Sequence, residues 1–268
     1  MGRKSKTKRV FFAMECQAPW PEELPKGKII PEESRHMTLA FLGNVDIEEL
    51  MSNLEEFPKP FFDLGFTAIL DKCLFFPEKR PRVAAWGVNF GNRENELKGF
   101  HKALLEWMKE YGYPVEDRDY VPHITLSRGK FSKRDWEDSF YPLPAALTNI
   151  HLFESLGRSE YRSLWEHPLF APFTEMEHTA DIAFKIRGRS TSEIYQHAAA
   201  ALAFECPDIL SYVEKGAAHT GLNDVISSLN HLISAADSDI GVPFKAVSYH
   251  GELTEKHHFL EWEMIVDV

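Results

Sequence analysis

One four-residue pattern occurs twice in this chain, as His36-Met37-Thr38-Leu39 and as His123-Ile124-Thr125-Leu126. On a β-strand, residues i and i+2 point to the same face of the sheet. Each copy would therefore present one imidazole and one hydroxyl on one face, and two apolar side chains to a core on the other. Two such strands that face each other would form a cleft lined by two histidines and two threonines.

This set of side chains suits phosphoester chemistry without a metal ion. An unperturbed imidazole titrates near pH 6.5, so at neutral pH one ring can be neutral while the other is charged. One ring would take up a proton and the other would donate one, while the hydroxyls donate hydrogen bonds to phosphoryl oxygens. A single copy is more often structural, but the chance of two accidental copies among 12 histidines is only about one in a thousand.

Four segments that read as strands surround and include the two motifs: residues 9–13, 36–43, 81–86 and 122–128. In this order they resemble the two-histidine phosphoesterases, specifically the RNA 2′,3′-cyclic phosphodiesterase branch that is also called 2′-5′ RNA ligase. The resemblance covers about residues 9–170. It implies an α+β fold with two similar lobes, in which two mainly antiparallel sheets and their helices enclose a central cleft.

The resemblance also implies a reaction and its residues. The reaction is opening of a terminal 2′,3′-cyclic phosphate on RNA to a 2′-phosphate, with reversible 2′-5′ joining of RNA ends as a lesser activity and no cofactor. By motif position, His36 and His123 are the acid/base pair, and Thr38, Thr125 and Arg128 bind the phosphate. Simple alternation along the strand, however, places Arg128 on the face opposite His123, so it reaches the cleft only if the strand ends or twists there.

Length and composition favour two domains in a soluble, cytoplasmic protein. The chain has 268 residues, of which 44% are hydrophobic, and this is more than one core usually holds. The three cysteines are scattered without a Cys-x-x-Cys spacing, which predicts reduced thiols. Residues 1–8 read as a basic, solvated tail, although such a tail can also touch RNA phosphates. No stretch is long and apolar enough to span a membrane.

Charge is divided unevenly along the chain. Residues 1–170 contain 24 Lys and Arg against 26 Asp and Glu, whereas residues 171–268 contain 6 against 15. A surface of this kind does not bind RNA over its whole extent. We therefore expect the first domain to recognise an RNA end through local contacts, and the second to suit a metal cation or a basic protein.

Two helices are predicted in the first domain. Asp46 can cap a helix that continues with apolar residues at helical spacing to Phe57. A longer helix is expected from about residue 92 to 111. Four prolines are expected to break regular structure, and the last two bracket the predicted domain boundary: Pro142, Pro144, Pro168 and Pro172.

The second half begins with a strand that continues to Arg187, followed by a capping box at Ser190–Glu193 and a helix. A second helix is expected over 222–236, and two final strands over 244–251 and 259–268. The sequence Glu-His-Thr-Ala-Asp at 177–181, the sequence Lys-Ala-Val-Ser-Tyr-His-Gly at 245–251 and the terminal Val-Asp-Val together resemble archease. From Pro172 onward only 96 residues remain, fewer than a typical archease has.

The archease resemblance implies a smaller α+β domain over 172–268 that activates the GTP-dependent RNA-splicing ligase. It also implies a divalent cation, Ca²⁺, Mg²⁺ or Mn²⁺, on Asp181 and Asp267, because hard cations prefer carboxylate oxygens. His178 and Glu177 are weaker candidates for the same site. Three further histidines, expected on a hydrophilic hairpin, are more simply solvated: His250, His257 and His258.

Two hypotheses of different classes stay open from the sequence. The first is an RNA end-processing enzyme, a cyclic phosphodiesterase fused to an archease-like module, whose partners would be RNA 3′ ends, including those of tRNA, and a splicing ligase. The second is a non-catalytic protein that binds RNA ends and assists the ligase through the archease-like domain. An enzyme that consumes a nucleoside triphosphate is disfavoured because the chain has no Walker loop.

Overall fold

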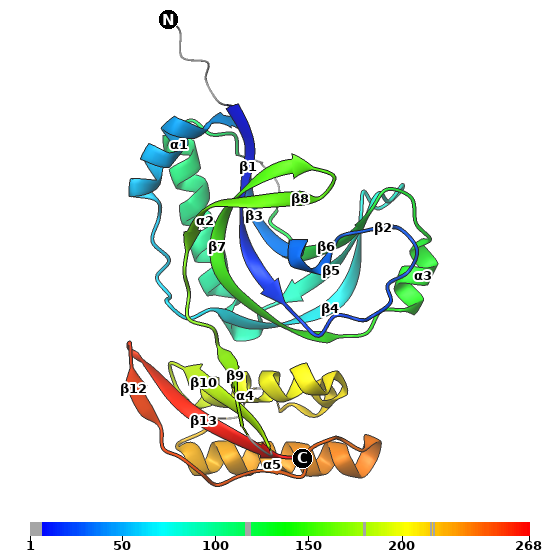
Figure 1. The fold of residues 1–268 in the computed structure, drawn as a ribbon, viewed down its shortest axis with the longest axis vertical. Coiled ribbons are helices and arrows are strands. Elements are labelled where there is room, and N and C mark those ends of the chain that lie inside the picture. The colour runs from blue at the N-terminus through cyan, green and yellow to red at the C-terminus, as the bar shows by residue number, and fades with distance from the viewer. Residues whose placement is uncertain (1–6, 116–118, 179–180, 215, 217) are drawn as a thin grey trace, which may run out of the picture.

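The structure is a computed structural model that describes residues 7–115, 119–178, 181–214, 216 and 218–268. Most of the basic tail predicted for residues 1–8 lies outside the described residues. Two parts of the chain lie one above the other in Figure 1, an amino-terminal part (7–169) and a carboxy-terminal part (173–268). Each part has its own cluster of buried apolar side chains.

The amino-terminal part is built on one antiparallel sheet. The strand order is β1-β3-β6-β5-β4-β7-β8, with β2 added beside β6, and a further pairing of β1 with β7 closes the sheet on itself. The strands thus form two halves, β8-β7-β1-β3 and β2-β6-β5-β4. This confirms the antiparallel α+β fold, with the two halves hydrogen-bonded to each other. The strands are β1 (Thr7–Gln17), β2 (Lys28–Ile29), β3 (His36–Asp46), β4 (Phe66–Phe76), β5 (Val83–Asn89), β6 (His123–Arg128), β7 (Leu143–Gly157) and β8 (Glu160–His167).

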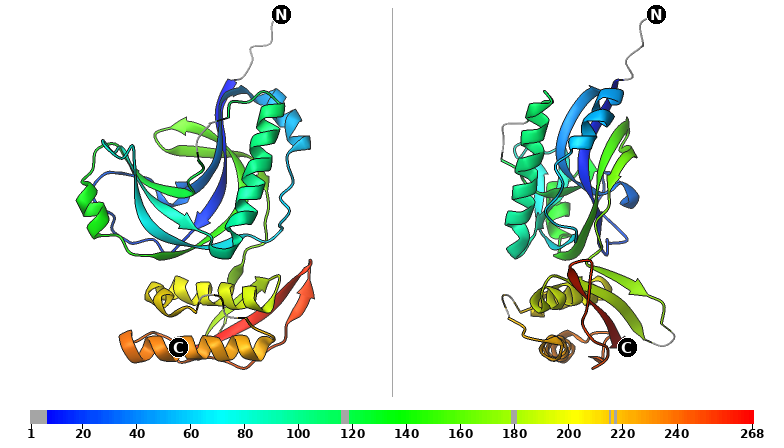
Figure 2. Two further views of the ribbon diagram at one scale, coloured as in Figure 1. Left: turned by 180° about the vertical axis from the view of Figure 1, so that it is seen from behind. Right: turned by 90° about the vertical axis from the view of Figure 1, so that its left-hand side faces the viewer.

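The helices of this part are α1 (Ile47–Asn53), α2 (Glu94–Glu110) and α3 (Lys133–Asp138). The carboxylate of Asp46 accepts hydrogen bonds from the backbone N–H groups of Glu48 and Glu49, which satisfies two free donors at the start of α1. A single 3₁₀ turn, Leu54–Glu56, follows α1, so the predicted helix is shorter than its apolar spacing indicates. Helix α2 covers one face of the sheet, as the side view in Figure 2 shows, with its buried stripe Leu97, Phe100, Leu104, Trp107 and Met108.

One expected break is wrong. Pro144 lies inside β7, where it is opposite Ile69 of β4. It is the second residue of the strand, and a residue without an N–H is tolerated near a strand's first position. Pro168 and Pro172, in contrast, lie between the last strand of the first sheet and the first strand of the second.

The carboxy-terminal part has a smaller antiparallel sheet in the order β11-β13-β10-β9, with β12 paired to β13. Of the strand predicted over 244–251, only two residues pair in the sheet, and the loop that follows contains Gly251 at a positive φ of 80°. Two long helices accompany the sheet, α4 (Thr191–Glu205) and α5 (Leu222–Ile240), with a 3₁₀ segment Pro207–Tyr212 between them. The strands are β9 (Phe173–Met176), β10 (Ile182–Gly188), β11 (Ala246–Val247), β12 (Thr254–Lys256) and β13 (Phe259–Asp267).

Helix α4 lies on the side of the carboxy-terminal part that faces the amino-terminal part (Figures 1 and 2). It packs against β10 and β13 on one side and against β7 and β4 on the other. Five of its buried residues are alanines, Ala198–Ala201 and Ala203, whose small side chains let neighbouring elements pack close to the helix from several sides. Among the residues that the structure describes, no helix is long and apolar enough to cross a membrane.

Candidate active site

The two motifs lie side by side at the centre of the first sheet. Strands β3 and β6 are antiparallel neighbours through the pair Met37–Ile124, and both of these side chains are fully buried. This register places Thr38 opposite His123 and His36 opposite Thr125, all four on the other face of the sheet. The two histidines are then diagonal neighbours, whose Cα atoms lie about 7–8 Å apart. This separation is small enough for one phosphate to lie between their rings.

The two imidazoles are held in the same way. Nδ1 of His36 donates to the carbonyl oxygen of Ser34 at 2.8 Å, and Nδ1 of His123 donates to that of Val121 at 2.7 Å. In both cases the acceptor lies two residues before the histidine. This hydrogen bond fixes the ring and its tautomer, so that Nε2 is the atom that exchanges a proton in each copy.

His36 has an apolar surrounding on its other side. Its ring lies 5.0 Å from that of Phe11, 5.7 Å from Phe153 and 4.9 Å from Tyr161, measured between centroids. Burial lowers the pKa of His36 to about 4, and the positive charges of Arg128 and His123 act in the same direction. The ring is therefore neutral at pH 7.

Arg128 reaches the cleft because of a β-bulge. The pairing of β5 with β6 runs from Ala85–Thr125 to Ala84–Ser127, so Leu126 has no partner of its own. Leu126 and Ser127 are consecutively buried, and Arg128 then faces the same side as Thr125. The alternation argument that places Arg128 on the opposite face is therefore wrong, because one extra residue shifts the alternation by one position.

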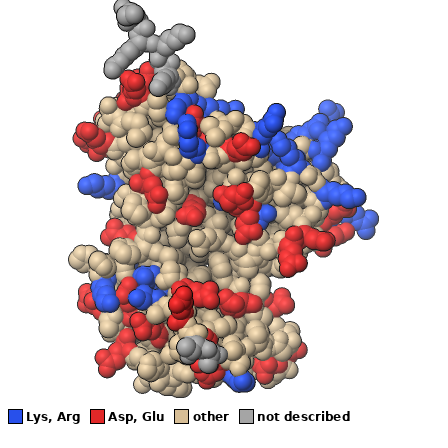
Figure 3. All heavy atoms as spheres, in the orientation of Figure 1, with Lys and Arg blue, Asp and Glu red and all other residues tan. Residues whose placement is uncertain are grey.

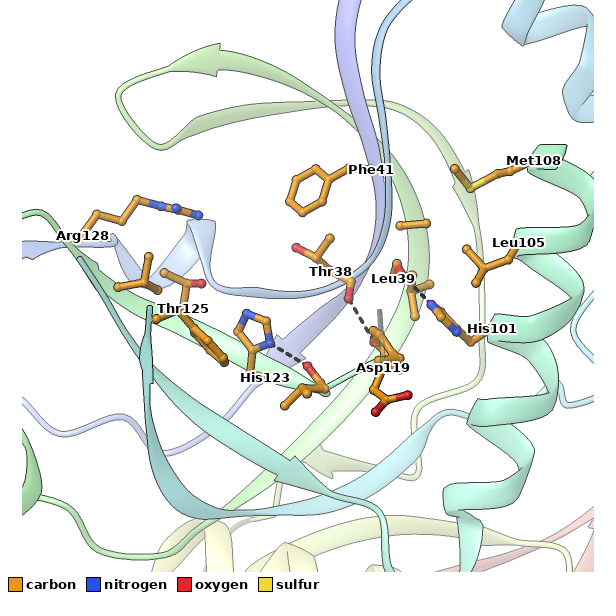
Figure 4. Close-up of a pocket in the computed structure, with 15 residues that line it drawn as sticks. Thr38, Leu39, Phe41, His101, Leu105, Met108, Asp119, His123, Thr125 and Arg128 are labelled. Atoms are coloured by element: carbon orange, nitrogen blue, oxygen red, sulfur yellow. Dashed lines mark hydrogen bonds between the residues drawn. The ribbon is translucent and has the colours of Figure 1, made fainter. Parts of the chain in front are cut away.

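A cavity of about 360 Å³ opens over this face. Thr38, His123, Thr125 and Arg128 surround it, and Figure 4 shows them around one space. His36 does not line this cavity but lies beside it at the start of β3. Toward α2 the wall becomes largely apolar, so one end of the cavity is polar and cationic and the other fits an uncharged ring system. Besides the four site residues, the cavity is lined by Leu39, Ala40, Phe41, Phe76, Val83, His101, Leu105, Met108, Asp119, Tyr120 and Val121.

Two residues that the sequence did not single out hold the backbone of the first motif. The hydroxyl of Tyr120 donates to the carbonyl oxygen of Thr38 at 3.0 Å. Nε2 of His101 bonds to the carbonyl oxygen of Leu39 at 3.1 Å, and its ring stacks on Tyr120 with centroids 4.0 Å apart. Burial lowers the pKa of His101, so that ring is neutral as well. The one sequence signal for the role of Tyr120 in holding this backbone is its position three residues before His123.

The two predicted metal ligands lie at the same end of the second sheet. Ile182 of β10 is opposite Val266 of β13, Asp181 directly precedes β10, and Asp267 is the last residue of β13. Nδ1 of His178 lies 3.7 Å from the carboxylate of Asp181, and Ser248 donates to that of Asp267 at 3.3 Å. Within the described ranges, which omit residues 179–180, no three His, Cys, Asp or Glu side chains are grouped so as to hold a metal ion. Two carboxylates alone form an incomplete cation site.

The other candidates of the second half are separated from this pair. His257 and His258 form the tight turn between β12 and β13, at positive φ angles of 51° and 69°. His250 lies in the loop before β12, where its carbonyl oxygen accepts a hydrogen bond from Trp262. The structure thus places these histidines in exposed loops.

Comparison with known proteins gives relatives of one kind. No family model matches the chain. The RNA 2′,3′-cyclic phosphodiesterase of Thermotoga maritima is 30% identical over 134 residues, which are 47% of this chain and 69% of the relative. The RNA 2′,3′-cyclic phosphodiesterase of Methanocaldococcus jannaschii is 30% identical over 135 residues, 46% of this chain and 72% of the relative.

Solved structures are similar to about three-fifths of the chain in length covered. The crystal structure of E. coli LigT complexed with 3′-AMP is 23% identical, covers 61% of this chain and 99% of its own, and has a TM-score of 0.46. That of TT0787 of Thermus thermophilus is 25% identical, covers 60% of this chain and 97% of its own, and has the same TM-score of 0.46.

Proposed function

Because the chain belongs to the RNA 2′,3′-cyclic phosphodiesterases, hydrolases of the two-histidine phosphoesterase family, we propose that its substrate is an RNA 3′ end that carries a 2′,3′-cyclic phosphate. The product is a 2′-phosphate with a free 3′-hydroxyl. Reversible 2′-5′ joining of RNA ends is the reverse use of the same chemistry. We further propose that residues 9–170 form the catalytic domain and residues 172–268 a second domain.

The proposed mechanism needs one neutral and one protonated imidazole. Nε2 of the neutral ring takes a proton from water as its oxygen attacks phosphorus. The bond from phosphorus to the 3′-oxygen breaks, and this oxygen receives a proton from Nε2 of the other ring. Thr38 and Thr125 donate hydrogen bonds to the phosphoryl oxygens, and the guanidinium of Arg128 offsets their negative charge. None of these steps draws on a cofactor.

One observation supports this proposal above the others, namely the register Met37–Ile124. It gives the two motifs a local twofold relation, with each histidine opposite the threonine of the other copy. A phosphate between them would meet equivalent groups from both sides. The equivalent Nδ1 bonds to Ser34 and Val121 support the same arrangement, since they orient both rings alike.

The test uses a short RNA that ends in a 2′,3′-cyclic phosphate. Hydrolysis by wild type is compared with that by His36→Gln and His123→Gln, and the product is identified as 2′- or 3′-phosphate by mass and by a 3′-specific phosphatase. We expect each variant to lose about 10²- to 10⁴-fold in kcat, the usual contribution of an acid or base. The control His231→Gln, at an exposed position of α5, should retain full activity. A wild-type protein without turnover would instead favour a non-catalytic RNA-end-binding role.

For the second domain we propose an archease-like accessory role toward an RNA-splicing ligase, with a divalent cation on Asp181 and Asp267. The position of these carboxylates beside the last pair of one ladder, Ile182–Val266, supports it. Hard cations bind such oxygens, but a complete site needs further oxygen ligands. We also propose a cytoplasmic location, in line with three cysteines that are all free thiols.

Titration calorimetry with Mn²⁺ or Ca²⁺ tests the cation, with Asp181→Asn and Asp267→Asn expected to weaken binding by at least about tenfold. Stimulation of a splicing ligase by added protein tests the accessory role. Loss of stimulation in Asp181→Asn, with cyclic phosphate hydrolysis retained, supports two separate activities. A protein that binds no cation and stimulates no ligase would overturn this part of the proposal.

A further inference from the structure

We propose that a positively charged strip beside the catalytic cavity binds the phosphodiester backbone of the RNA that leads to the cyclic phosphate. This inference rests on the proposed function. We call the strip the cationic rim. It comes from β2, from the turn between β4 and β5, and from the end of β6, and it consists of six exposed side chains: Lys28, Lys79, Arg80, Arg82, Arg128 and Lys130.

The rim is continuous with the cavity. Arg128, which lines the cavity, is opposite Lys28 on β2 and opposite Val83 on β5. The backbone N–H of Gly129 donates to the carbonyl oxygen of Arg82 at 2.8 Å, which joins the turn to the end of β6. The turn 77–82 begins after Phe76, whose ring lies 4.9 Å from that of His123. The cations therefore extend outward from the wall of the cavity.

The charge of the rim departs from that of the rest of the molecule. The chain as a whole has a net charge of −11, whereas the three segments that form the rim contain Glu78 as their only carboxylate. Figure 3 shows Lys and Arg gathered at the upper right, over the β4–β5 turn and the neighbouring α3. Within the described residues, none of the six rim cations forms an ion pair with a carboxylate. The cations of α3, in contrast, are paired, Lys133 with Glu137 and Arg134 with Asp138.

The two ends of the cavity suit different parts of one RNA end. The end toward α2 is largely apolar, with Leu105 and Met108, and fits a nucleobase. The opposite end, at Arg128, leads onto the rim. Unpaired surface cations bind phosphates by releasing counterions, without regard to sequence. The rim would thus bind a polynucleotide, whereas a single nucleoside cyclic phosphate would occupy the cavity alone.

The experiment compares two substrates in the full-length protein. One is cytidine 2′,3′-cyclic phosphate, and the other is a six-nucleotide RNA with the same terminal group. In the triple variant Arg80→Ala/Arg82→Ala/Lys130→Ala we expect kcat/KM on the RNA to fall by at least about tenfold. The slope of log KM against log salt concentration should decrease by about 2, because the variant lacks three cations and each single-strand phosphate contact contributes about 0.7 to this slope. Activity on the mononucleotide should stay within about twofold.

A matched variant, Lys59→Ala/Lys98→Ala/Lys256→Ala, removes three exposed cations outside the rim and should leave both substrates unaffected. The proposal is overturned if the rim variant loses activity equally on both substrates, or if it treats both as wild type does. The latter result would indicate that the rim binds an acidic protein partner and not RNA. Failure of the proposed function is distinguishable, because the wild type would then hydrolyse neither substrate.

Discussion

At the scale of single residues, the least ordinary group in the site is His36. Its ring is enclosed by three aromatic rings, and burial lowers its pKa to about 4. In the unfolded chain the same ring titrates near 6.5. Between these two values the unfolded state binds a proton that the folded state does not, so the folded protein loses stability as the pH falls from 6.5 toward 4.

This linkage predicts the behaviour of His36→Gln. The wild type should lose free energy of unfolding between pH 7 and pH 5, and the variant should lose about 1–2 kcal/mol less, because one of the buried rings no longer takes part. Part of the slope should persist, since burial lowers the pKa of His197 to about 4 as well. Urea denaturation at both pH values measures the difference. An equal loss in both proteins, with His231→Gln as reference, would argue against a buried neutral His36.

At the scale of elements, alternation predicts a strand's faces only while the ladder is regular. The four motif side chains of β3 and β6 follow the period of two, so sequence alone could place them on one face. Arg128 does not follow it, because the bulge at Leu126 depends on pairing with β5, which is distant in sequence. Tyr120 and His101 likewise bond to backbone carbonyl oxygens of the first motif. A pattern of side chains in the sequence does not predict which carbonyl such a residue contacts.

Helices were predictable where a cap and an apolar stripe coincide. Asp46 and Ser190 both accept the backbone N–H bonds expected of an N-cap. Strand β7 gave a weaker signal, because its run of small apolar residues and Pro144 also fits a loop. Helix α4 was predictable as a helix, but its burial on all sides was not, since the amino-terminal part supplies its second neighbour.

The packing of α4 leads to a prediction for Ala201→Leu. Ala201 is fully buried in a helix that has neighbours on both sides. Three added carbons have no free volume there, so we expect the free energy of unfolding to fall by about 1–3 kcal/mol. Thermal and urea denaturation measure the loss. The same exchange at Ala235, which is only half-buried on α5, should be tolerated, and equal effects at both positions would contradict a tightly enclosed α4.

At the scale of the whole molecule, the two parts are joined by a network of ion pairs. The guanidinium of Arg189, in the carboxy-terminal part, donates to both carboxylate oxygens of Glu96 on α2 at 2.9 and 2.8 Å. It also donates to Glu193 on α4 at 3.0 and 2.9 Å. Arg93, which is buried and donates to the carbonyl oxygen of Gly65 at 2.6 Å, lies 3.5 Å from Glu193. Glu193 therefore connects charges from both parts.

The network predicts a large effect for Glu193→Gln. Burial alone would raise the pKa of Glu193, but the hydrogen bonds from Arg189 outweigh it and lower the pKa to about 2. The charged carboxylate thus stabilises the fold above its ordinary pKa of 4.5, and this contribution disappears as the pH falls toward 2. Neutralising it removes one carboxylate charge from Arg189 and from Arg93, which keeps its ion pair with Glu96 at 3.0 Å. We therefore expect a loss of about 2 kcal/mol at pH 7 that shrinks below pH 4. Calorimetry should then resolve separate melting of the two parts. Glu94→Gln, at an exposed pair with Lys98, should cost less than about 0.5 kcal/mol, and a single unshifted transition in Glu193→Gln would show that the parts are held together by apolar packing of α4 instead.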